Sequence, residues 1–310
     1  MRVSSAYILS HSGLGDNVVM ISCIHFLANF YDDVYYLCRC DHCKQMEYVY
    51  KPFPFIHIVP IPLVNSGESN DENKSFLLPK YENSDIFICG NHRCYLNSKI
   101  THPYLLDYSL LYKDFPQGFQ SFMREPYKNI FPNIDNYYKY HYDGIDNNKY
   151  MPNFFDFISD FYRSINLNPI IYYDFFYIPI SSEILNLYNN ISHYNIIFLH
   201  SSSSGTNDFY YTSLLVKPWL DIDNIIIISA NYNYYDPNHY KYKIANQYIE
   251  LPTIFHYIEI IKNSDIIYMT NSCISCMTLP YIQKGQIKAD ISNINIYERN
   301  CHQLCNLDIF

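Results

Sequence analysis

The chain opens with a short apolar run, a glycine-rich turn and a helical segment. The run Ala6 to Ser10 predicts a strand, the turn carries Gly13, Gly15 and Asp16, and the residues from Asn17 to Phe30 predict a helix. In α/β proteins, the N–H groups of such a helix start bind ligands at the carboxyl end of the strand. Glycines there let the backbone approach a ligand and adopt dihedrals that other residues avoid. This opening predicts an α/β fold with a candidate site at Asp16.

Asp16 has more than one chemical interpretation. As the only acid of the turn it can act as a general base, or it can simply cap the helix by accepting backbone N–H groups. A third interpretation is a nicotinamide dinucleotide site, and hence a dehydrogenase, but the turn matches only part of the glycine fingerprint of such sites. Val18 stands where the third glycine of that fingerprint belongs, and no acid follows the next apolar strand, Val34 to Cys38.

Apolar runs alternate with helical segments in both halves of the chain. This alternation predicts parallel sheets with crossover helices. We expect two Rossmann-like domains with a ligand cleft between them: residues 1–165, with a helical elaboration from about residue 100, and residues 166–310. The expected strands are Ala6–Ser10, Val34–Cys38, Phe55–Ile61, Ile86–Cys89, Ile196–His200, Ile225–Ser229, Tyr248–Leu251 and Ile266–Thr270.

The amino-acid composition and the net charge argue against some classes of function. The 310 residues carry a net charge of −9 and form no basic stripe, which argues against a nucleic-acid ligand. The 35 tyrosines and 20 phenylalanines, with abundant Ile and Asn, indicate a low-GC genome, as in some large viruses and protists. The chain has neither a signal-peptide core nor a run long enough to span a bilayer. We therefore expect a soluble cytoplasmic protein, in the host cytoplasm if the source is viral.

The ten cysteines are expected to be reduced thiols. Two small groups, Cys38–Cys43 with His42 and Cys89–Cys94 with His92, contain residue types that bind zinc. Paired C-x2-C spacings are missing from both groups, so scattered thiols are the preferred interpretation and no metal site is expected.

Three blocks in sequence order resemble the heptosyltransferase-like group of GT-B glycosyltransferases. The first is the turn Gly13-Leu14-Gly15-Asp16. The second is Phe198-Leu199-His200-Ser201-Ser202, followed by Lys217-Pro218-Trp219. The third is Asn263-Ser264-Asp265, a strand, and Asn271-Ser272-Cys273-Ile274-Ser275-Cys276, where Asn271 replaces the usual Asp and Cys276 the usual His.

The resemblance implies metal-independent, inverting transfer of a sugar from a nucleotide-sugar to a hydroxyl of a glycan or other acceptor, without a cofactor. It implies that Asp16 is the base, that Gly13 and Gly15 form the acceptor-side loop, and that the C-terminal domain binds the donor. The expected donor-binding residues are His200, Ser201, Ser202, Lys217, Glu250, Ser272 and Cys273, with Glu250 at the ribose or base. The alternative is a non-catalytic nucleotide- or glycan-binding protein with a degenerate GT-B fold, suggested by Asn271 and Cys276.

Overall fold

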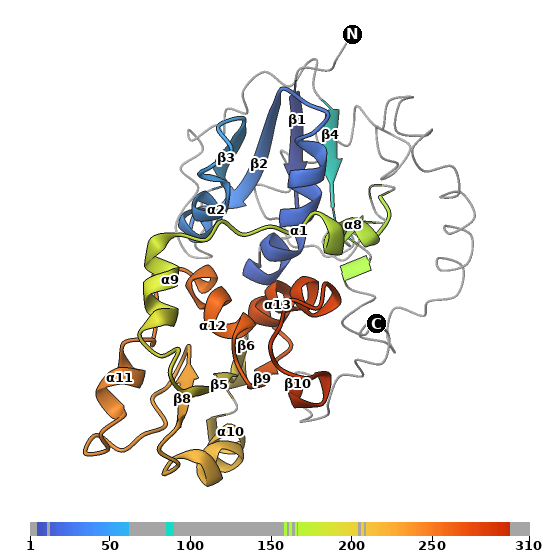
Figure 1. Cartoon of the computed structure of the whole chain (residues 1–310). Coiled ribbons are helices and arrows are strands. Elements are labelled where there is room, and N and C mark those ends of the chain that lie inside the picture. The colour runs from blue at the N-terminus through green and yellow to red at the C-terminus, as the bar shows by residue number, and fades with distance from the viewer. Residues whose placement is uncertain are drawn as a thin grey trace, which may run out of the picture. The chain divides into compact units, whose positions relative to one another are not determined.

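The computed structural model describes residues 5–10, 13–61, 85–89, 158–159, 161–162, 165, 167–203, 206–207 and 209–297. The chain divides into two compact units, Met1–Tyr177 and Ile178–Phe310 (Figure 1). Most of the expected helical elaboration between residues 100 and 165 lies outside the described residues.

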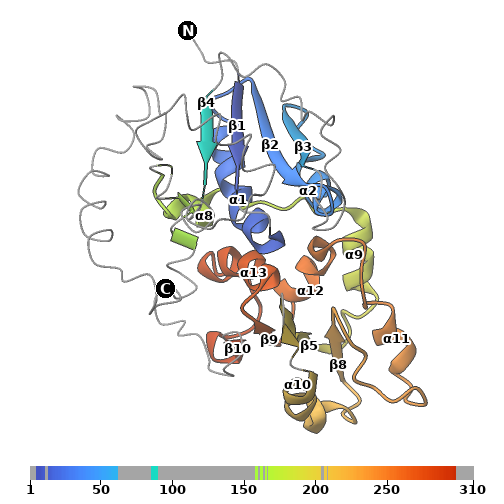
Figure 2. The same ribbon diagram turned by 180° about the vertical axis from the view of Figure 1, so that it is seen from behind.

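Unit 1 is built on a four-stranded parallel sheet in the order β3-β2-β1-β4 (Figure 2). In this order the chain adds β2 and β3 on one side of β1 and β4 on the other. The reversal puts a topological switch point at the carboxyl ends of β1 and β4, the place where such sheets bind ligands. The elements are β1 (Ser5–Leu9), α1 (Leu14–Leu27), β2 (Asp33–Arg39), α2 (Cys43–Tyr50), β3 (Ile56–Ile61), β4 (Asp85–Ile88) and α8 (Ile170–Asp174).

Helix α1 is buried along most of its length, and α8 packs against it. The Ser22 hydroxyl donates to the Tyr172 carbonyl at 2.7 Å, and the Tyr162 hydroxyl donates to the Val19 carbonyl at 2.7 Å. These contacts attach the segment before Tyr177 to α1, and so to unit 1. The structure accordingly divides the chain after Tyr177, whereas the expected boundary followed residue 165.

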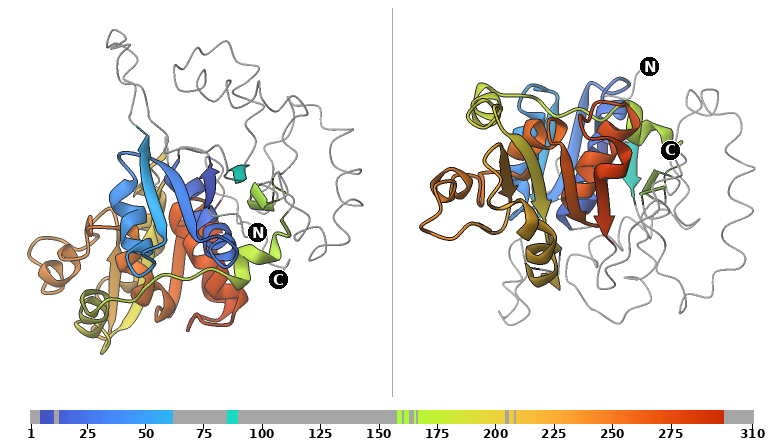
Figure 3. Two further views of the ribbon diagram at one scale, coloured as in Figure 1. Left: turned by 90° about the horizontal axis from the view of Figure 1, so that it is seen from above. Right: turned by 60° about the horizontal axis from the view of Figure 1, so that its bottom comes forward.

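Unit 2 contains a second four-stranded parallel sheet, in the order β10-β9-β5-β8 (Figure 3). After β5 the chain adds β8 on one side and β9 on the other, so the switch point of this sheet lies between β5 and β9. The elements are α9 (Ser182–Asn189), β5 (Asn195–His200), β6 (Ser202–Ser203), β7 (Thr206–Asn207), α10 (Phe209–Val216), η1 (Lys217–Trp219), β8 (Ile225–Ser229), α11 (Tyr242–Asn246), η2 (Ile254–Tyr257), α12 (Ile258–Lys262), β9 (Ile266–Thr270), α13 (Cys273–Gln283), η3 (Ile291–Asn293) and β10 (Ile294–Tyr297).

The expected α/β class is confirmed: two parallel sheets alternate with helices, consistent with two Rossmann-like domains. One expected strand, Tyr248–Leu251, is wrong. This segment is a turn in which Glu250 has φ +54°, a left-handed conformation incompatible with a strand. The last strand, β10, was not anticipated. Within the described residues, no helix has the length and apolarity needed to cross a membrane.

Candidate functional site

The switch point of unit 2 brings together His200 and Ser272, which the sequence placed in separate blocks. His200 ends β5, and Ser272 precedes the first turn of α13, after β9. The Ser272 hydroxyl lies 3.1 Å from His200 Nδ1, and only 7 % of His200 is exposed. Burial lowers the pKa of His200 from 6.5 to about 4, so its imidazole is neutral at pH 7. In the described part of the chain, its other ring nitrogen, Nε2, has no hydrogen-bond partner.

The serine loop after β5 is fixed by polar contacts from both neighbouring strands. The Thr270 hydroxyl, at the end of β9, lies 3.4 Å from the His200 carbonyl and 3.3 Å from the Ser202 carbonyl. From the side of β8, the Asn231 amide donates to the Ser202 hydroxyl at 2.9 Å. The loop continues as the small β6–β7 hairpin, in which Ser202 pairs with Asn207.

Two buried polar atoms at this edge lack a hydrogen-bond partner among the residues that the structure describes. They are the hydroxyl oxygen of Ser201, a residue with no exposed surface, and the side-chain carbonyl oxygen of Asn231. An unsatisfied buried polar group costs about 1–3 kcal/mol, and native structures keep few of them without a reason. Both atoms belong to loops at the carboxyl ends of adjacent strands, β5 and β8.

Glu250 also lies at this edge, through its backbone. Its N–H donates to the Ala230 carbonyl at 3.2 Å, which holds the turn against the end of β8, next to Asn231. A positive φ at a non-glycine residue is strained, and such strain persists only where the surroundings maintain it. The side chain of Glu250 is exposed.

The two remaining residues that were expected to bind the sugar donor, Cys273 and Lys217, lie in different places. Cys273, partly exposed, is the first residue of α13 and stays with Ser272 at the switch point. Lys217 does not join them: helix α10 carries the chain back across the sheet, and Lys217 is an exposed residue of η1, shortly before the amino end of β8. Cys276, which replaces the usual His, is buried within α13. Asn271 donates its backbone N–H to the Tyr297 carbonyl at 2.8 Å.

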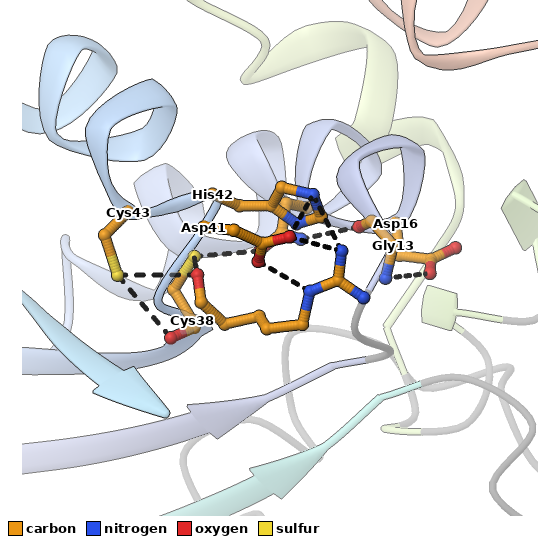
Figure 4. A network of polar contacts seen from close by, with 8 residues as sticks. Gly13, Asp16, Cys38, Asp41, His42 and Cys43 are labelled. Atoms are coloured by element: carbon orange, nitrogen blue, oxygen red, sulfur yellow. Dashed lines mark hydrogen bonds and ion pairs between the residues drawn. The ribbon is translucent and has the colours of Figure 1, made fainter. Parts of the chain in front are cut away.

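In unit 1, Asp16 is the third residue of α1 and forms a capping contact with Gly13, the N-cap residue of this helix. Its Oδ2 atom accepts the Gly13 N–H at 2.9 Å (Figure 4). The expectation that these glycines adopt unusual dihedrals is wrong. Gly13 has φ −73° and ψ 152°, and Gly15 lies in the first turn of α1, so the backbone here is ordinary. The reason for a glycine at position 13 is space, because a Cβ would lie 2.6 Å from Asp16 Oδ2.

Asn17, which the sequence analysis did not single out, fixes this turn. It is almost fully buried, and its amide donates to the Gly13 carbonyl at 2.6 Å. Its side-chain oxygen accepts from the Tyr36 hydroxyl at 2.7 Å and from the Cys38 thiol at 3.4 Å, both on β2. The Ser10 hydroxyl, 3.2 Å from that of Tyr36, extends the network to the end of β1. Burial raises the pKa of Tyr36 well above 10, so the phenol remains a donor.

A group of charged side chains lies at the carboxyl end of β2, on the edge of the sheet that also carries the glycine turn. Arg39 forms a two-pronged ion pair with Asp41, with Nε–Oδ1 and Nη2–Oδ2 distances of 2.6 Å, and Nη2 also lies 3.2 Å from His42 Nε2 (Figure 4). The Asp41 contact raises the pKa of Arg39 and the Arg39 contact lowers that of Asp41. This pairing lies just before α2, whose N-cap residue is His42.

The described cysteines are free thiols: Cys23, Cys38, Cys40, Cys43, Cys89, Cys273 and Cys276. Burial raises the pKa of Cys38 and of Cys89, which makes these two thiols poor nucleophiles. No cluster of three or more His, Cys, Asp or Glu side chains suited to a metal ion occurs among the residues that the structure describes.

The residues missed by sequence reasoning are Asn17, Tyr36, Asn231 and Thr270. Two of them had a readable signal, since Asn231 and Thr270 follow or end a strand next to small polar residues. The contacts of Asn17 and Tyr36 depend on how β1 and β2 pair, which no local motif encodes.

No family model matches the chain, and searches of curated proteins and of solved structures found no match either. The heptosyltransferase-like resemblance therefore rests on the three sequence blocks alone, and the cleft expected between the two domains stays a prediction.

Proposed function

We propose that the chain is a glycosyltransferase that moves a sugar from a nucleotide-sugar donor to a hydroxyl of a glycan or another acceptor. Unit 2 binds the donor diphosphate at the carboxyl ends of β5 and β9. The observation that carries this proposal is the meeting of His200, Ser201, Ser202 and Ser272 at the carboxyl edge of this sheet, where two buried polar atoms lack partners among the described residues.

The chemistry of this edge suits a diphosphate. If the Ser272 hydroxyl donates to His200 Nδ1, the imidazole proton sits on Nε2, which then donates to a phosphate oxygen. The serine hydroxyls add neutral donors, and the first turn of α13 supplies backbone N–H groups and the positive end of its dipole. Such groups stabilise a leaving diphosphate, so we propose transfer without a divalent metal.

In the proposed reaction, the acceptor hydroxyl oxygen attacks the anomeric carbon while the bond between that carbon and the diphosphate oxygen breaks. Asp16 takes the hydroxyl proton, and the nucleoside diphosphate leaves with the bonding electrons. This displacement inverts the anomeric centre. Asp16 accepts the Gly13 N–H through Oδ2, and in the proposed reaction its carboxylate takes the proton.

The test is release of nucleoside diphosphate from a panel of nucleotide-sugars, with mixed glycans as acceptors. We expect turnover with at least one donor, retained in a chelator and lost in Asp16→Asn. Turnover that a chelator abolishes and manganese restores would contradict metal-independent transfer.

The second candidate is a nucleotide- or glycan-binding protein of the same fold without catalysis. Two observations favour it: Asp16 already has a capping role, and Lys217 lies away from the other expected donor residues. Donor binding without turnover, unchanged by Asp16→Asn, would identify this case.

A further inference from the structure

A second polar and aromatic cluster lies in unit 2, near the amino end of β8 and away from His200. After β8 the chain folds back along the outer side of this strand, where the Tyr235 hydroxyl accepts the Ile227 N–H at 2.9 Å. Because β8 is an edge strand, the contact satisfies a backbone donor that would otherwise lack a partner. The returning segment ends beside Asp221 and Asp223, which precede β8.

Three rings form a continuous stack in this segment. The centroids of Tyr235 and His239 lie 4.7 Å apart, those of His239 and Tyr240 lie 4.6 Å apart, and both pairs are inclined by 23°. The Tyr240 hydroxyl donates to Asp223 Oδ1 at 2.9 Å. Buried Lys241 places its Nζ 5.1 Å from the Tyr240 centroid and donates to the Ile222 carbonyl. The Tyr240 ring is thus held in one orientation.

The outer end of this stack is open. Tyr240 is 59 % exposed although His239 stacks against its ring and Lys241 Nζ lies over it. Protection of the strand edge does not explain this exposure, since the buried Tyr235 provides it. Beside the stack, the Asp221 side chain is 96 % exposed, with its Oδ1 3.9 Å from His239 Nε2.

We propose that Tyr240, Asp221 and Asp223 form a binding site for a neutral sugar ring, separate from the site at β5 and β9. The C–H face of a pyranose packs against an aromatic face, and carboxylates accept hydrogen bonds from its hydroxyls. The carboxylates disfavour an anion. The Lys241 ammonium already interacts with the Tyr240 ring, which disfavours a second cation. A fixed ring also loses little conformational entropy on binding.

The test is saturation-transfer NMR on the full chain with three neutral oligosaccharides: maltotetraose, cellotetraose and chitotetraose. We expect at least one to bind in the millimolar range. Tyr240→Ala should weaken binding roughly tenfold, whereas Tyr240→Phe keeps the ring and should retain most of it. Tyr177→Ala is the matched control, because Tyr177 is 51 % exposed in unit 1.

Asp221→Ala gives an independent result, because this side chain is too exposed to affect folding, and it should also weaken binding. Ser272→Ala should leave sugar binding unchanged, which separates this site from the proposed donor site. The proposal is overturned if none of the three sugars binds, or if Tyr240→Ala and Asp221→Ala bind them as the wild type does. Choline is the cationic probe of the Tyr240 ring, and binding of choline but of none of the sugars would also overturn the proposal.

Discussion

Replacing His200 by Asn should remove a pH dependence of stability that the wild-type chain shows between pH 7 and pH 5. Burial holds the pKa of His200 at about 4 in the folded state, against 6.5 when unfolded. Between these values the unfolded state binds more protons, so the free energy of unfolding falls as pH falls from 6.5 to 4. Integrating from pH 7 to pH 5 gives a loss of about 2 kcal/mol from this residue.

The assay is urea unfolding at both pH values, followed by the fluorescence of Trp219, the single tryptophan, which lies in unit 2. Asn at position 200 keeps a polar group for Ser272 but does not titrate. His25, whose pKa burial also lowers to about 4, is present in every variant and lies in unit 1. The His200→Asn chain should therefore lose about 2 kcal/mol less between pH 7 and pH 5 than the wild type.

Ser272→Ala is the matched control. It should cost about 1–3 kcal/mol at both pH values, because it leaves His200 Nδ1 without its partner. It should keep the wild-type pH dependence, since burial, not this hydrogen bond, lowers the pKa. If His200→Asn loses as much stability between pH 7 and pH 5 as the wild type, or if Ser272→Ala loses about 2 kcal/mol less, the burial of His200 does not cause this pH dependence.

Four further single variants, at positions 13, 16 and 250, test the glycine turn and the strained residue. Asp16→Asn should keep the fold and the donor affinity while the rate of transfer falls roughly 100-fold or more, and undiminished turnover would end the catalytic proposal. Asp16→Ala should cost about 1 kcal/mol of stability. Gly13→Ala should cost about 1 kcal/mol by displacing the Asp16 carboxylate, and nearly nothing in an Asp16→Ala background, so additive melting shifts would contradict the contact. Glu250→Gly should raise stability by about 1 kcal/mol in urea unfolding because its φ is +54°, and a loss would show that the strain estimate is wrong.

The strands were predictable because their apolar runs are short and buried. In β5, five successive residues after Asn195 are buried, as expected for a parallel strand covered on both faces. The segment Tyr248–Leu251 resembles these apolar runs in sequence, but its backbone groups bond to a tyrosine hydroxyl instead of to a neighbouring strand. The Tyr257 hydroxyl donates to the Tyr248 carbonyl at 2.6 Å and accepts the Leu251 N–H at 3.1 Å. Side-chain contacts of this kind have no sequence signature.

The candidate site was predictable one residue at a time but not as an arrangement. Strand-end positions identified His200 and Ser272, yet their contact joins residues 72 positions apart and depends on β9 pairing with β5. Lys217 follows the serine loop closely in sequence, but α10 takes it toward the amino end of β8. Proximity along the chain was therefore a poor guide once a crossover helix intervened.

We propose that the carboxyl edge of β5 and β9 binds a nucleoside diphosphate. Hydrogen–deuterium exchange on the full chain, with and without the diphosphate of uridine, guanosine or adenosine that most raises the melting temperature, tests it directly. We expect slower exchange in the loop from Ser201 to Ser203 and in the first turn of α13, and no such protection in Ser272→Ala. Protection confined to the turn around Gly13 in unit 1, or no stabilisation by any of the three diphosphates, would contradict it.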